Sequence, residues 1–229
     1  MHATVRGFVA GVAVLSLAAC SDSTTSLRQV APHAPSAPAF DFSAAGALGS
    51  TESDFVVDAN GGSFSLGAYT VSFPGNSVCD PTISTYGTTE WDNNCDVLPD
   101  GQSIKIHATI SLTSEGLTVD FTPALRFSPS AKVTISTDIF ASFILANQDY
   151  FKTNRKALSA FAILYSPGPG SKAVSDFAAD ASVTTHVDLN TGRVWRRVKH
   201  FSGYSIISGE ACEPSPDNPD CIEIDGDGH

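Results

Sequence analysis

Alternating apolar and polar residues are the dominant pattern in the middle of the chain. In the stretch SIKIHATISL, apolar side chains occupy every second position from Ile104 to Leu112, and polar side chains occupy the positions between them. The same period of two returns in three further segments, residues 69–73, 117–121 and 183–189. A period of two over this length indicates a strand with one buried face.

Turn-forming residues separate these segments, at Gly61-Gly62, Pro74-Gly75-Asn76, Pro99-Asp100-Gly101 and Asn190-Thr191-Gly192. Short strands joined by frequent turns predict an all-β fold, an antiparallel β-sandwich. We expect this domain to span residues 54–209, which is enough chain for one core. The run at 159–165 is apolar on both faces, as a central strand would be.

One segment breaks the strand pattern. Between residues 138 and 156, apolar side chains recur at helical spacing, at Ile139, Phe140, Phe143 and Ile144. This spacing predicts a short helical or irregular crossover, with Asp138 as its candidate cap.

The two ends of the chain lack a core-forming pattern. Residues 1–19 combine Arg6 with an apolar run that is shorter than the roughly 20 residues of a membrane-spanning helix, so we expect a cleaved secretory signal. Residues 20–53 are rich in Ser, Thr, Ala and Pro, which predicts a flexible tether. Residues 210–229 form an acidic, Pro-rich tail.

The signal ends in Leu17-Ala18-Ala19-Cys20, which resembles the lipobox of bacterial lipoproteins. The resemblance implies that the Cys20 thiol carries lipid such as palmitate and anchors the mature chain to a membrane of the cell envelope. Ser21 stands where an aspartate would imply retention in the inner membrane, so the outer membrane of a Gram-negative bacterium is the implied location. An ordinary secretion signal with an incidental cysteine is the alternative.

The net charge limits which partners the chain can bind. The chain has a net charge of −11, and removal of residues 1–19 takes away one charged residue, Arg6, which leaves a net charge of −12. A chain this acidic is not expected to bind nucleic acid through its overall field. The oligomeric state stays open.

Four cysteines remain after Cys20, and an exported chain meets an oxidising compartment, so disulfides are expected. Four cysteines allow three pairings. We favour Cys79–Cys95 and Cys212–Cys221, because each pair brackets one local loop.

No catalytic, phosphate-binding or dinucleotide motif is present, so we expect a non-enzymatic protein without a cofactor. His107 and His186 fall on the polar side of strands, where solvated side chains are expected. The tail residues Glu223, Asp225 and Asp227 could coordinate calcium through their carboxylates. The complete ligand loop of a calcium site is missing from the sequence, so a solvated tail is the preferred interpretation.

The Cys79–Cys95 loop contains two aromatic residues, Tyr86 and Trp91. Aromatic rings on a pinned loop can contact an envelope glycan or a protein partner, or they can fold back onto the sandwich.

The order of strands and turns resembles ZU-five domains, the sandwich of ankyrins, netrin receptors and zonula-occludens protein. The segments that carry the resemblance are GGSFSLGAYTVSFPGNSV, LTVDFTPALRFSPSAKVTIST and RVWRRVKHFSGYSIISG. Residues 76–102 look like an insertion relative to that family. The resemblance implies a binding or scaffolding module.

Some members of that family cut themselves within a His-Phe-Ser motif, which occurs here as His200-Phe201-Ser202. If the same reaction takes place in this chain, Ser202 would attack the carbonyl of Phe201, with His200 as the base. In a regular strand, His200 and Ser202 lie about 6.6 Å apart along the axis, which is too far for proton transfer at about 3 Å. Self-processing therefore requires a kink, which a bulge near Gly203 could supply.

Overall fold

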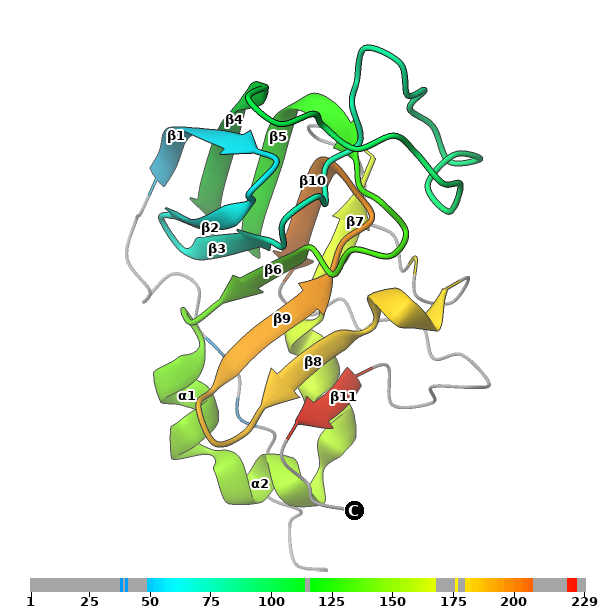
Figure 1. Cartoon of the computed structure of the whole chain (residues 1–229). Helices are drawn as coiled ribbons and strands as arrows, with labels where there is room; N and C mark the ends of the chain where they lie inside the picture. Colours follow the sequence, from blue (N-terminus) through cyan, green and yellow to red (C-terminus); the bar gives the residue numbers. More distant parts are fainter. Residues whose placement is uncertain are drawn as a thin grey trace, which may run out of the picture. The chain divides into compact units, whose positions relative to one another are not determined.

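The computed structural model describes residues 38, 40, 49–113, 116–167, 176, 180–207 and 222–225. Its strands form two sheets, and the all-β prediction is confirmed. Figure 1 shows the strands of both sheets and the helical segment that follows β6.

The first sheet has the strand order β1-β4-β5-β10-β7, and every neighbouring pair is antiparallel. Its members are β1 (Gly49–Asp58), β4 (Ser103–Thr113), β5 (Gly116–Arg126), β10 (His200–Ile207) and β7 (Leu164–Ser166). The predicted strand around Ile104–Leu112 is therefore β4, next to the edge strand β1.

The second sheet has the order β11-β8-β9-β6-β3-β2. Its members are β2 (Gly62–Leu66), β3 (Tyr69–Phe73), β6 (Thr134–Thr137), β8 (Thr185–Asp188), β9 (Arg193–Arg197) and β11 (Ile222–Asp225). All its pairs are antiparallel except β8 with β11, which run parallel. This sheet is therefore mixed, where the sequence predicted purely antiparallel pairing.

The inner faces of the two sheets meet in one apolar core. Phe201 of β10 stacks on Phe121 of β5, with ring centroids 3.9 Å apart, and meets Phe73 of the opposite sheet edge-on at 5.6 Å. The Tyr69 hydroxyl of β3 donates a hydrogen bond to the Leu117 carbonyl of β5 at 3.2 Å. These contacts join the sheets face to face, as the alternating patterns require.

The crossover near 138–156 is helical, as predicted. It consists of α1 (Ala141–Ala146), α2 (Gln148–Thr153) and the 3-10 helix η1 (Arg155–Phe161). The expectation that Asp138 caps it is wrong: the N-cap of α1 is Phe140, without a side-chain cap bond. The Asp138 backbone carbonyl instead accepts a hydrogen bond from the Ala141 N–H at 2.9 Å.

Two further segments differ from the prediction. Residues 159–161 lie in η1, and only Leu164–Ser166 form a strand, β7, at the edge of its sheet. The segment 159–165 is apolar on both faces because its helical part is buried as well, at Ser159 and Phe161. The acidic tail contributes β11, which adds to the edge of the second sheet beside β8.

Candidate functional site

The loop between β3 and β4 is closed by the Cys79–Cys95 disulfide, with Cα atoms 5.7 Å apart. This pairing confirms the prediction made from the sequence. Figure 1 draws the loop as the long teal-to-green connection between β3 and β4. The disulfide gives a long, polar segment a fixed base beside the first sheet, because Cys79 also donates its N–H to the Arg126 carbonyl of β5.

Two basic side chains hold this loop against the sheet. The Arg126 guanidinium is buried, and its Nη1 donates to the carbonyls of Glu90 at 2.8 Å and Asn93 at 2.7 Å. Lys199, just before β10, pairs with Asp92 of the loop. Charged donors make stronger hydrogen bonds than neutral ones, so these contacts fix the loop over β5 and β10.

The loop brings its own aromatic residues, Tyr86 and Trp91, into contact with the predicted His200-Phe201-Ser202 motif. The Trp91 ring stacks on His200, with centroids 3.6 Å apart and planes 16° apart. The Tyr86 hydroxyl donates to the Phe201 carbonyl at 3.0 Å and lies 3.3 Å from His200 Nδ1. We call Tyr86, Trp91, Tyr165, His200 and Tyr204 the His200 cluster, because each of the other rings lies near His200.

The packing of Trp91 onto His200 depends on ring stacking. The Trp91 Nε1 is buried and has no hydrogen-bond partner in the part of the chain that the structure describes. One face of the indole lies against His200, while the Tyr86 side chain is 41% exposed. Ligand contact by these two residues stays a prediction, and Tyr86 is the more accessible of them.

His200 is almost completely enclosed, with 2% of its surface exposed. Burial, together with the nearby charges of Arg196 and Lys199, lowers its pKa from 6.5 to about 3. The imidazole is therefore neutral at neutral pH. Because the Tyr86 hydroxyl donates to Phe201, the Nδ1–H tautomer of His200 would donate to the Tyr86 oxygen.

The pairing of β10 with β5 is irregular beside the His-Phe-Ser motif. Between the pairs Phe201–Leu125 and Gly203–Asp120, β10 advances by two residues and β5 by five, so the extra residues lie on β5. A Cβ at Gly203 would lie 2.5 Å from Asp120 Oδ1, so glycine is required for this close approach. Burial raises the pKa of that Asp120 carboxyl. Because the extra residues lie on β5, this irregularity does not supply the kink within β10 that self-processing needs, and that kink stays a prediction.

Sequence reasoning did not connect Tyr86 with the motif. The two are 115 residues apart, and Tyr86 reaches the Phe201 carbonyl only because the disulfide, Arg126 and Lys199 position the loop. An O–H donor on the carbonyl of the Phe201–Ser202 bond is the group that could stabilise a developing oxyanion there. The cysteine spacing was the only signal that this loop is fixed.

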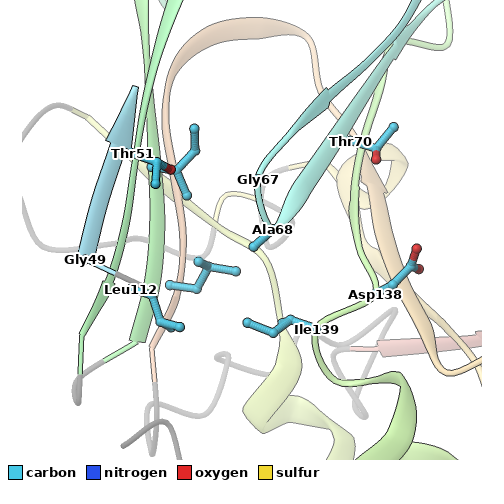
Figure 2. Close-up of a pocket in the computed structure, with 10 residues that line it drawn as sticks. Gly49, Thr51, Gly67, Ala68, Thr70, Leu112, Asp138 and Ile139 are labelled. Carbon is cyan, nitrogen blue, oxygen red and sulfur yellow. The ribbon is translucent and has the colours of Figure 1, made fainter. Parts of the chain in front are cut away.

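A second site is an apolar cavity of about 480 Å³ between the two sheets. Figure 2 shows Leu112 of β4 on one side, Ile139 on the other, and Ala68 of the β2–β3 turn between them. Ile110 and Leu117 add apolar surface, and Thr51, Thr70 and Asp138 contribute polar atoms. The volume and the mainly apolar lining are typical of sites for small ligands.

Of the three tail carboxylates predicted as possible metal ligands, the structure describes the side chain of Asp225. The Asp225 carboxylate accepts a hydrogen bond from Trp195 Nε1 at 2.6 Å and lies 3.1 Å from His186 Nδ1. The Glu223 side chain and Asp227 lie outside the described residues. In the described ranges, no three His, Cys, Asp or Glu side chains gather to hold a metal ion.

Several predictions fall on parts of the chain that the structure does not describe. These are the signal, the anchor Cys20 with most of the tether after it, and the pair Cys212–Cys221. The last part of the predicted tether, residues 49–53, belongs to β1 and pairs with β4, because the sheet begins before residue 54. The described residues contain no helix that is long and apolar enough to cross a membrane.

The chain was also compared with family models, with curated proteins and with solved structures, and none of these comparisons gave a match. The functional assignment therefore rests on the residues and their geometry.

Proposed function

We propose that this chain is a lipid-anchored cell-envelope protein whose ZU-five-like sandwich is a non-enzymatic binding module. The Leu-Ala-Ala-Cys sequence supports an anchor at Cys20, in the outer membrane of a Gram-negative bacterium. The observation that carries the binding role is the apolar cavity between the sheets. Its ligand is a small apolar or amphiphilic molecule, since the lining is aliphatic with Thr51, Thr70 and Asp138 as the polar groups.

A fluorescent probe tests this proposal. The chain from residue 20, with Cys20→Ala, is titrated with N-phenyl-1-naphthylamine, a neutral dye that brightens in apolar surroundings. Saturable brightening is expected, because a dye ring buries apolar surface at about 25 cal/mol per Å². Ala68→Phe adds a ring to the cavity wall and should weaken binding at least tenfold.

Ala124→Phe is the matched control, because Ala124 is exposed on β5 and does not line the cavity. It should bind the dye as the parent chain does. Absence of saturable binding, or equal binding by the two phenylalanine variants, would overturn the proposal.

Self-processing at Phe201–Ser202 is a second candidate, favoured by the Tyr86 hydrogen bond to the Phe201 carbonyl. The Ser202 oxygen would bond to the Phe201 carbonyl carbon as the C–N bond breaks, leaving an ester and a free Ser202 amine. Water would then hydrolyse the ester to a Phe201 carboxylate and restore the serine hydroxyl. His200 would be a weak base, since burial lowers its pKa to about 3.

Intact mass of the denatured, reduced chain distinguishes the two candidates. Self-processing predicts a fragment from Ser202 to His229 in the parent chain, its absence in Ser202→Ala, and slower formation in Tyr86→Phe. A single full-length mass after prolonged incubation at neutral pH would exclude self-processing and leave the binding module as the remaining candidate.

A further inference from the structure

A third site lies on the outer face of the second sheet, over β8, β9 and β11. These strands lie side by side in Figure 1. Along β9, Val194 and Arg196 are buried, while Arg193, Trp195 and Arg197 face away from the core. A hollow of about 310 Å³ opens there, lined by Thr134, Asp188, Arg193, Trp195 and Asp225. We call it the Trp195 hollow.

The indole of Trp195 is held in one orientation. Its Nε1 donates to Asp225 Oδ2 at 2.6 Å, and its ring stacks on His186 with centroids 4.0 Å apart and planes 9° apart. Asp225 Oδ1 lies 3.1 Å from His186 Nδ1, so one carboxylate orients both rings. An aromatic side chain that is fixed in advance loses little conformational entropy when a ligand binds.

The polar groups around the indole suit a ligand with many hydroxyls. Asp225 accepts one bond on each oxygen, and a carboxylate has about four acceptor sites, so capacity remains. Hydrogen bonds from Thr191 and Asn190 lower the pKa of Asp188 against the raising effect of burial, which keeps it an ionised acceptor. Arg193 adds donors, and its Nη2 is hydrogen-bonded to the Ser136 hydroxyl at 2.8 Å.

The charged side chains around the Trp195 hollow disfavour small anions and cations as ligands. Two carboxylates, Asp188 and Asp225, oppose a small anion, and the Arg193 guanidinium opposes a cation that would otherwise favour an aromatic face. A neutral sugar ring carries both an apolar C–H face for the indole and hydroxyls that donate and accept. The volume of about 310 Å³ is at the small end of ligand sites, which fits one or two sugar units.

From these observations we propose that the Trp195 hollow is a binding site for a neutral saccharide of the envelope. It shares no lining residue with the apolar cavity and no member with the His200 cluster. The two binding proposals can therefore fail independently.

An array of neutral oligosaccharides built from glucose, galactose, mannose and N-acetylglucosamine tests this site with the full mature chain. At least one member should bind at millimolar concentration or tighter. Trp195→Ala should weaken that binding at least tenfold, and Arg193→Ala, an exposed position, should weaken it several-fold. Trp195→Phe keeps a ring but loses the Asp225 bond, so it should fall between the parent and Trp195→Ala.

Two controls separate this site from the others. Trp91→Ala removes the other tryptophan, and Ala68→Phe alters the cavity, and both should bind the sugar as the parent does. Circular dichroism melting checks that each variant is folded. Lack of binding to every member of the array, or binding that Arg193→Ala and Trp195→Phe leave unchanged, would overturn the proposal.

Discussion

The burial of a neutral His200 predicts a specific loss of stability in mild acid. The pKa of an unfolded histidine is 6.5, and burial lowers that of folded His200 to about 3. Below about pH 6.5, the unfolded chain takes up a proton that the folded chain does not, so the free energy of unfolding falls as pH falls through this window.

The magnitude follows from the two pKa values. Proton uptake by the unfolded chain costs about 0.2 kcal/mol of stability at about pH 7 and about 2 kcal/mol at about pH 5. The loss between these two pH values is therefore about 2 kcal/mol. It hardly depends on the folded value, because any folded pKa below about 4.5 gives nearly the same result at about pH 5.

Urea unfolding at a series of pH values, followed by tryptophan fluorescence, measures this loss. His200→Gln cannot be protonated, so it should lose about 2 kcal/mol less than the parent chain between about pH 7 and pH 5. His107→Gln, which removes an exposed ring, is the matched control and should retain the acid sensitivity of the parent. An equal loss of stability in acid for the parent chain and His200→Gln would contradict this prediction.

Three further substitutions probe the packing around this site. Replacing Cys79 by alanine opens the loop and should lower the free energy of unfolding by about 2–4 kcal/mol in chemical denaturation. Gly203→Ala places a Cβ 2.5 Å from Asp120 Oδ1 and should cost about 1–3 kcal/mol, part of which Asp120→Ala should restore in a double-mutant cycle. Arg196→Met leaves Asp176 without its two hydrogen bonds at 2.9 and 2.8 Å, and should cost about 3–5 kcal/mol. Adding Asp176→Leu should restore most of that loss, and an unchanged thermal melt in Arg196→Met would contradict this estimate.

The strands with the longest alternation were predictable, because one buried face imposes a period of two on the sequence. Residues 104–112 show this most clearly, and they form the central part of β4. Residues 159–165 were not predictable in this way, since a short apolar run looks alike in a buried strand and a buried helix. Strand β11 was not predicted either, because its alternation covers only four residues within an acidic tail.

The candidate sites were predictable only where local sequence carries the constraint. The Cys79–Cys95 pair follows from spacing, but the stacking of Trp91 on His200 depends on strand order and on Arg126, which no local pattern reveals. His186 was expected to be solvated, because its strand alternates. The structure instead places it against Trp195, since the outer face of this sheet carries its own packed cluster.

We propose that this protein binds a small apolar or amphiphilic molecule between its two sheets. The most direct measurement is the mass of any molecule that remains bound to the chain from residue 20, with Cys20→Ala, when it is purified without detergent and extracted with organic solvent. We predict about one molecule per chain from the parent and from Ala124→Phe, and little from Ala68→Phe. Equal recovery from both phenylalanine variants, or recovery from none of the three chains, would contradict the account.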